Sequence, residues 1–208
     1  MARLLMVGVL LFASVEAKAH PHAWIDLKSE VQLNPHGEVE AIELYWLFDP
    51  FYTAFIAEEV LADGRPPAEV LVEIANTNLT NLRDYDYFTD VRLDDRRLAL
   101  DDVTHSETGL TEDRLWMRFT VPLTEAVDPD AGQLTFAVYD PTYYIDIRYA
   151  EGVFPELTGA TSDNCRGTVF EPTPSPEDVA FAYSLGPDES AGDTLGILFA
   201  QTTVIGCS

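Results

Sequence analysis

Residues 23–33 read AWIDLKSEVQL, and this stretch decides the expected fold. Its odd-numbered positions are mostly apolar, as at Ile25 and Leu27, and its even-numbered positions are mostly polar, as at Asp26 and Lys28. An alternation with a period of two is typical of a β-strand that buries one face. The chain is therefore expected to enter its core as a half-buried strand.

A turn, a second alternating stretch and two helical stretches follow. Residues 34–37 read NPHG, which is turn chemistry, and the alternation resumes over 39–46, so the two stretches predict a β-hairpin. Asp49 can then cap a helix over 51–61, because an acidic cap followed by proline suits a helix start. A second helix, with one broad apolar face, is expected over about 67–83.

Strands dominate the rest of the chain. Ser175 can cap a short helix through Tyr183, Asp193 can cap another through Ala200, and residues 202–207 are expected to end the chain as a strand. The expected fold class is α+β: an antiparallel, β-sandwich-like body with two inserted helices and a disulfide-tied C-terminal segment. Turn residues separate the other strand-like stretches, 90–93, 97–100, 114–122, 133–139, 142–149 and 164–170.

The N-terminus has the three zones of a secretory signal. Arg3 supplies the basic start, residues 4–13 the apolar run and Ala19 the end of a small-residue cleavage site. The alternative is a membrane anchor, but the run falls well short of the roughly 20 apolar residues that a spanning helix needs. We expect residues 1–19 to be a signal peptide and residues 20–208 to form a single periplasmic domain.

The charge balance is strongly acidic. The chain has 36 Asp and Glu against 12 Lys and Arg, a formal net charge of −24. Such a surface repels nucleic acid and anionic lipid, so no nucleic-acid partner is expected. No later stretch is apolar enough to span a membrane, so no membrane insertion is expected after signal cleavage. The charge either serves solubility alone or also attracts cations.

Cys165 and Cys207 are the only cysteines in the chain. An even pair in an exported protein predicts a disulfide, which would close a loop of about 43 residues and stabilise the fold by roughly 4 kcal/mol in the chain-entropy model. The competing interpretation is a metal-thiolate pair. An exported protein favours the disulfide, because thiols in an oxidising compartment tend to be oxidised.

Histidines gather at the expected mature N-terminus. Residues two apart in a strand share a face, so His20, His22, Trp24 and Asp26 are expected to project to one side. Cleavage before His20 would add a free amine to these donors. Nitrogen and carboxylate donors suit zinc, copper or nickel better than calcium or magnesium. The alternative is a frayed, solvated terminus that binds nothing. His105, in a polar loop, is a second-tier ligand candidate together with Asp26.

Patterns of enzyme chemistry are missing from the sequence. It contains no glycine-rich phosphate loop, nucleophile elbow or histidine-glutamate zinc-protease pattern, and no catalytic residue is predicted. Residues 138–146 concentrate aromatic and acidic side chains. Asp140 before Pro141 is expected to fix a turn there.

Four motifs occur in an order that resembles a known bacterial family. They read HPHAWID, WLFDPFYTAF, NLRDYDYFT and VYDPTYY and begin at residues 20, 46, 81 and 138. The family is the one catalogued as domain of unknown function 1007. The resemblance covers nearly the whole mature chain and implies the periplasmic component of an uncharacterised ABC-type or nickel-cobalt-zinc transport system.

This sequence departs from the family in two places. Many relatives have an acidic, glycine-containing loop between the two helices that looks like a calcium site, but here the loop is reduced to ADGRPP at 62–67, so no calcium is expected there. The histidine-rich tract of some metal-handling relatives is also missing. The resemblance therefore implies a single metal site and not a high-capacity buffer.

Residues and resemblance together predict a non-enzymatic periplasmic accessory protein. It would bind a transition metal, zinc in first place and copper or nickel otherwise, through His20 and His22, and would work with a metal-ion permease in the inner membrane. Two alternatives stay open. One is a copper-dependent enzyme that uses the N-terminal histidine, and the other is a metal-free adaptor that touches the permease through its aromatic surface.

Overall fold

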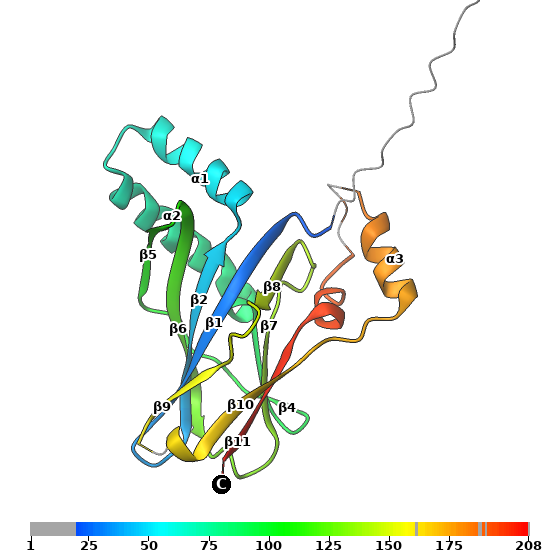
Figure 1. Cartoon of the computed structure of the whole chain (residues 1–208). Helices are drawn as coiled ribbons and strands as arrows, with labels where there is room; N and C mark the ends of the chain where they lie inside the picture. The colour runs from blue at the N-terminus through cyan, green and yellow to red at the C-terminus, as the bar shows by residue number, and fades with distance from the viewer. Residues whose placement is uncertain (1–19, 161, 187–188, 190, 208) are drawn as a thin grey trace, which may run out of the picture.

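A computed structural model describes residues 20–160, 162–186, 189 and 191–207. The predicted signal peptide lies outside the described residues. The remainder forms two β-sheets, three α-helices and short 3₁₀ turns (Figure 1). The α+β class predicted from the sequence is confirmed.

The first sheet is built on the predicted hairpin of β1 (Ala23–Leu33) and β2 (Val39–Phe48). Strand order is β5-β6-β2-β1-β8, with β9 also paired to β1. In β1 the residues at odd-numbered positions are all buried, as the alternation predicted. The other strands of this sheet are β5 (Ser106–Thr111), β6 (Arg114–Val127), β8 (Ile145–Tyr149) and β9 (Glu156–Gly159).

The expectation of a wholly antiparallel body is corrected at one edge. Both β8 and β9 run parallel to β1. The chain reaches β8 from the second sheet through the loop 139–144, which delivers it beside the start of β1, so that β8 must run in the same direction. Hydrophobic alternation reports burial and says nothing about the direction of the neighbouring strand.

The second sheet has the order β10-β11-β7-β3-β4, and each of its pairs is antiparallel. The last strand, β11, lies between β10 and β7, so the end of the chain is an internal strand of the sheet. The five strands are β3 (Thr89–Leu93), β4 (Arg96–Arg97), β7 (Leu134–Val138), β10 (Cys165–Phe170) and β11 (Thr202–Cys207).

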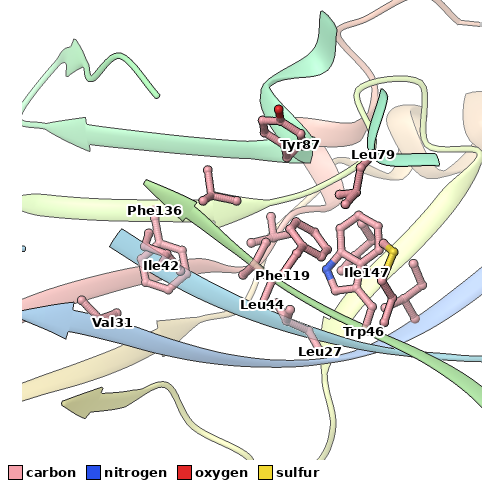
Figure 2. Packing of buried hydrophobic residues seen from close by; sticks show 14 of the residues in the cluster. Leu27, Val31, Ile42, Leu44, Trp46, Leu79, Tyr87, Phe119, Phe136 and Ile147 are labelled. Carbon is pink, nitrogen blue, oxygen red and sulfur yellow. The ribbon is translucent and has the colours of Figure 1, made fainter. Parts of the chain in front are cut away.

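One hydrophobic core joins the two sheets, as expected for a sandwich (Figure 2). Trp46 of β2 packs edge-on against Phe119 of β6, with ring centroids 5.0 Å apart. Phe136 of the second sheet and Leu79 of a helix belong to the same cluster. Burying each such side chain contributes about 1.5–3 kcal/mol, so this cluster supplies the main stabilisation of the fold.

The two inserted helices are α1 (Pro50–Asp63) and α2 (Pro67–Leu82), close to the predicted bounds. Asp49 caps α1 by accepting hydrogen bonds from the backbone N–H groups of Phe51 and Tyr52. Gly64 ends the helix in a left-handed conformation with φ of 79°, which glycine adopts without a side-chain clash. A 3₁₀ turn, η1 (Arg83–Phe88), follows α2 and leads into β3.

The C-terminal segment folds back over the start of the domain. Helix α3 (Pro176–Ser184) begins with a reciprocal cap between Ser175 and Asp178. The helix expected from Asp193 to Ala200 is a single 3₁₀ turn, η3 (Gly196–Phe199), so that prediction was too long. A further 3₁₀ turn, η2, lies at Ser162–Asn164. No helix in the described part of the chain is long and apolar enough to cross a membrane.

The disulfide is confirmed and closes this segment. Cys165 and Cys207 are bonded, with Cα atoms 4.0 Å apart, and they are direct partners across β10 and β11. The chain between them contains α3 and η3. Because η3 packs against the loop before β8, the disulfide-closed segment is tied to the end of the sheet at which β1 begins (Figure 1).

Candidate functional site

The start of β1 lies beside the loop that precedes β8. The backbone N–H of His22 donates a hydrogen bond to the carbonyl of Tyr144, with a distance of 2.8 Å. Trp24, the first outward-facing residue of β1, is 46% exposed, as the alternation predicted. The strand begins only at Ala23, so the alternation does not decide where His20 points.

His20 is buried instead of frayed. Only 3% of the residue is exposed, and its Nε2 lies 2.9 Å from the backbone carbonyl oxygen of Glu189. A carbonyl oxygen can only accept, so Nε2 must carry the proton. In the neutral ring Nδ1 is then the nitrogen with the lone pair. This Nδ1 atom is buried and has no hydrogen-bond partner among the residues that the structure describes.

The two histidine rings are neighbours. Their centroids lie 4.9 Å apart at an interplanar angle of 81°. The ring of Tyr144 stacks on His22 with centroids 4.5 Å apart, and it meets the edge of His20 at 5.9 Å. Tyr144 therefore packs on one side of the pair while remaining 47% exposed itself.

Asp140 shapes the loop that carries Tyr144. Its buried carboxylate accepts hydrogen bonds from the N–H and hydroxyl of Thr142, at 2.9 and 2.8 Å, and from the N–H of Ile145, at 3.0 Å. The turn predicted at Asp140 and Pro141 is confirmed. Its consequence, that Tyr144 lies against His22, was not visible in the sequence.

Tyr143 points the other way and anchors the loop to the C-terminal segment. Its ring stacks on Phe199 at 4.2 Å, and burial raises the pKa of Tyr143 to about 12, so the phenol stays neutral at neutral pH. Gly196 lies so close to this loop that an added Cβ would sit 1.9 Å from the carbonyl oxygen of Asp140. The loop is thus held between β1 and η3.

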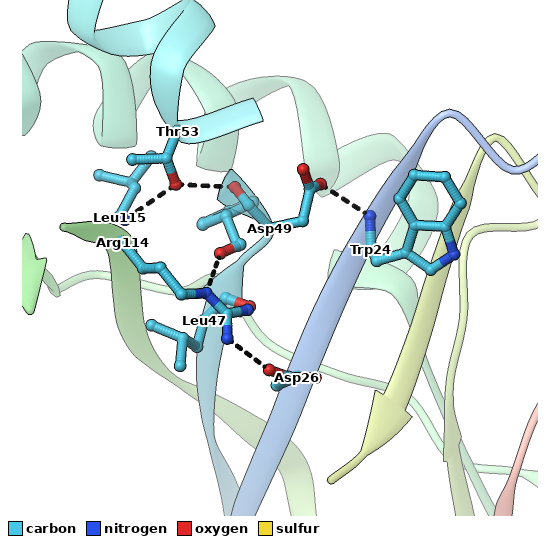
Figure 3. A network of polar contacts seen from close by, with 8 residues as sticks. Trp24, Asp26, Leu47, Asp49, Thr53, Arg114 and Leu115 are labelled. Atoms are coloured by element: carbon cyan, nitrogen blue, oxygen red, sulfur yellow. Dashed lines mark hydrogen bonds and ion pairs between the residues drawn. The ribbon is translucent and has the colours of Figure 1, made fainter. Parts of the chain in front are cut away.

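Asp26 does not join the histidines. Its carboxylate pairs with Arg114 of β6 at 2.7 Å (Figure 3). The same guanidinium donates to the carbonyl of Phe48 at 2.7 Å and to that of Leu47 at 3.0 Å. This contact comes from a strand 88 residues further along the chain, and no local pattern around Asp26 predicts it.

His105 is also placed elsewhere. It precedes β5 at the far edge of the first sheet and is 80% exposed, with Nε2 3.9 Å from Glu107. The strand register puts its neighbour Ser106 level with Ser29 of β1, across three strand spacings of about 4.8 Å each. Ser29 itself lies seven residues after His22, about 23 Å along the chain at about 3.3 Å per residue. The structure does not bring His105 to the histidine pair.

The histidine site is therefore a pair and not a complete cage. Among the described residues, no group of three or more His, Cys, Asp or Glu side chains is arranged to hold a metal ion. The expected contribution of a freed amine at His20 depends on the cleavage, which concerns residues outside the described part. The structure does bring together the imidazoles of His20 and His22. The Nε2 of His20 is held by the carbonyl of Glu189, and the half-exposed ring of Tyr144 packs on the pair.

The fold and the site define a two-sheet α+β domain with a histidine pair where its first strand begins. The chain belongs to the family described as "Protein of unknown function (DUF1007)", whose model matches residues 5–207. It is similar to an uncharacterised protein of Haemophilus influenzae (strain ATCC 51907 / DSM 11121 / KW20 / Rd), with 26% identity over 201 residues and 95% of each chain covered. No solved structure matches it. The family resemblance noted in the sequence is confirmed.

Proposed function

We propose that the protein is a periplasmic accessory protein that binds a divalent transition metal, zinc in first place, and works with a metal permease in the inner membrane. The observation that carries the proposal is the state of His20. Its Nε2 donates to the carbonyl of Glu189, and its buried Nδ1 has no hydrogen-bond partner in the described part of the chain.

That arrangement is the one that metal-binding histidines share. A ligating imidazole usually donates its other N–H to a carboxylate, a backbone carbonyl or water, which fixes the tautomer and aims the lone pair at the metal. A buried acceptor that binds nothing costs about 1–3 kcal/mol. A metal on Nδ1 would remove that cost.

The second ligand of the proposed site is His22, whose ring centroid lies 4.9 Å from that of His20. Tyr144 stacks on His22 and restricts its rotation. A third nitrogen would come from the α-amine of His20 after cleavage behind Ala19. Two imidazoles and an amine leave a zinc position for water or for a group of a partner, and an open position suits a protein that must also release its metal.

The charge of the chain supports cation capture. A net charge of −24 raises the local concentration of divalent cations and speeds their encounter with the site. The same charge would attract a basic surface on the permease.

Metal titration of the processed protein tests the proposal. Purified protein that begins at His20 should bind zinc with a stoichiometry of one by isothermal titration calorimetry, and His20→Ala or His22→Ala should each remove most of the affinity. His36→Ala is the matched control, because His36 lies in the exposed turn after β1. Zinc binding that is equal in all four proteins, or no binding of zinc, copper or nickel, would reject the metal proposal and leave the metal-free adaptor.

The copper-enzyme alternative has a separate readout. It requires the amine and the imidazole of His20 on one metal, so one extra alanine before His20 should abolish copper-dependent oxygen consumption. Copper binding without oxygen consumption favours the accessory role.

A further inference from the structure

A second surface lies beside β9 and β10, at the end of the domain away from the start of β1 (Figure 1). A groove of about 500 Å³ runs between the chain segment that leads into β9 and the strand β10. We infer that this groove binds an extended peptide of a partner protein, which adds a strand to β10 and brings one bulky apolar side chain and one carboxylate with it.

The groove has an apolar lining that remains open to solvent. Its walls include Phe154, Pro155, Leu157, Cys165, Gly167 and Val169. Phe154 is 64% exposed, although it is one of the largest apolar side chains in this region. Leu157 and Val169 pack against the main core but are only partly buried. A bulky apolar side chain placed here would therefore cover apolar surface that is otherwise exposed to solvent.

Strand β10 offers a free backbone edge along the groove. It is the terminal strand of the second sheet, and within the described residues its ladder partner is β11 alone. Five consecutive residues of this strand, 165–169, line the groove. Strand β9 on the opposite wall pairs only with β1 in the same described part. An edge strand presents a row of N–H and C=O groups that an extended peptide can pair with.

The edge is held in place by covalent and steric contacts. The disulfide between Cys165 and Cys207 ties the start of β10 to the internal strand β11. At the buried Gly167 an added Cβ would lie 2.9 Å from the Cβ of Pro155, so Pro155 packs closely on the inner face of β10. An edge that is ordered before binding loses little conformational entropy when a partner strand adds to it.

Arg166 supplies the charge at the rim. Arg114, Arg118 and Arg148 each pair with a carboxylate, whereas Arg166 makes no ion pair with any described residue. An unpaired guanidinium next to an apolar groove, in a chain with a threefold excess of acids, suits a ligand with its own carboxylate. A small amphipathic anion would satisfy Arg166 and the apolar walls but would leave the backbone of β10 unpaired, so the peptide fits better.

Hydrogen exchange followed by NMR tests this inference on the processed, oxidised protein. The probe is a blocked heptapeptide of alternating threonine and valine, with a central phenylalanine and one glutamate. Its binding should slow exchange of the β10 amides that do not bond to β11, while the amides of β5, an edge strand of the other sheet, serve as the control. Equal protection of β5 would show non-specific pairing and overturn the inference.

Variants separate the contributions of the apolar anchor, the charged contact and the backbone pairing to peptide binding. Phe154→Ala and Arg166→Ala should each weaken peptide binding about tenfold, as expected for an apolar anchor and a charge-assisted contact. Phe181→Ala, which alters a half-exposed aromatic residue on α3, should leave binding unchanged. A peptide whose backbone amides are blocked by N-methylation should not bind. If it binds as well as the parent peptide, or if dodecanoate protects the same amides, the groove is a site for apolar ligands and strand addition is rejected.

Discussion

Two regions near the start of the domain, Asp26 within β1 and the histidine pair just before β1, differ in how their polar groups are satisfied. At Asp26 the carboxylate meets Arg114, and the guanidinium also binds two backbone carbonyls (Figure 3). At His22 and His20 the imidazoles meet each other and Tyr144, and the Nδ1 of His20 is buried without a hydrogen-bond partner among the described residues.

The difference lies in how completely the described residues satisfy these polar groups. Around Asp26 the network continues through Asp49, which accepts from the N–H of Trp24, and through Thr53, whose hydroxyl donates to the Asp49 carbonyl and accepts from the N–H of Leu115. These groups hold β1, β6 and the start of α1 together and need no ligand. The histidine pair differs because the Nδ1 of His20 is an acceptor that the described part of the chain does not satisfy, and the proposed metal site rests on that atom.

The largest effect on the free energy of unfolding is expected at Asp49, in the region where the polar groups are hydrogen-bonded. Asp49→Ala removes the cap of α1 and leaves the N–H groups of Trp24, Phe51 and Tyr52 without their acceptor, so the free energy of unfolding should fall by about 3 kcal/mol. Urea unfolding measures it. Asp49→Asn is the control, because its amide oxygen can still cap and should recover much of the loss. A change below about 1 kcal/mol would show that the network is not structural.

The histidine pair should give the opposite result. Without metal, His20→Ala should lower the free energy of unfolding by only about 1–2 kcal/mol, because the lost packing of the buried ring and the lost hydrogen bond are partly offset by removal of an unsatisfied acceptor. With zinc at 100 times its Kd, the parent protein should gain about 2.7 kcal/mol and the variant nothing. Thermal unfolding with and without zinc measures both. Equal zinc stabilisation of parent and variant would erase the distinction between the two regions.

A smaller effect is expected at Asp26 itself. Its side chain is 48% exposed, so Asp26→Ala should cost only about 1 kcal/mol, because solvent screens the ion pair with Arg114. Zinc affinity should change by less than about twofold, because the carboxylate is committed to Arg114. Calorimetric titration checks this, with His22→Ala as the variant that must lose affinity. A tenfold loss in Asp26→Ala would restore Asp26 as a ligand.

The smallest effect concerns Asp146, the direct neighbour of Trp24 on β8. Burial raises the pKa of Asp146 above its ordinary 3.8, and this outweighs the opposing influence of Arg148. Between pH 3.8 and the raised pKa the folded chain binds more protons than the unfolded chain, so this group lowers stability as pH rises through that range. Asp146→Asn should flatten this part of the stability profile.

Glu107 provides a control of opposite sign for that measurement. The guanidinium of Arg118 lowers the pKa of Glu107 below 4.5, so its contribution is present above pH 4.5 and is lost as pH falls through the lowered pKa. Glu107→Gln should therefore change the acid side of the profile in the other direction. The same sign in both variants would contradict the assignment.

The sequence predicted those elements whose apolar residues follow a regular period. The hairpin of β1 and β2, both inserted helices and the strands β6, β10 and β11 all follow from alternation, helical spacing or cap residues. The disulfide followed from an even pair of cysteines in a chain that is expected to be exported. In each case the signal lies within the segment itself, so no knowledge of its partners is needed.

Elements without such a period were missed. Strand β5, with its partly exposed pattern, was expected to be part of a polar loop, and β9 has only four residues with none fully buried. Both lie at sheet edges, where one neighbouring strand fixes the conformation and burial is weak. The 3₁₀ turn η3 was expected to be a longer helix, because a cap residue followed by apolar residues can precede either a short 3₁₀ turn or an α-helix.

Of the candidate site, the sequence predicted the pairing of His20 and His22 but not the groups that hold them. His20 and His22 do lie together, but His20 is held by the carbonyl of Glu189, 169 residues away, and His22 by Tyr144. A backbone carbonyl leaves no trace in a sequence, so its use as an acceptor is visible only in the fold. Asp26 does lie on the outward side of β1 with Trp24, but its carboxylate pairs with Arg114 of β6 and not with the histidines.

The covalent link between Cys165 and Cys207 has a practical consequence for limited proteolysis. Those residues are 42 positions apart, and α3, η3 and the carbonyl that holds His20 all belong to the chain between them. A single cut in this span yields two fragments that stay attached and migrate as one species in non-reducing electrophoresis. A reducing agent is needed to release them. A cut beside the histidine pair is therefore detected only when reducing and non-reducing gels are compared.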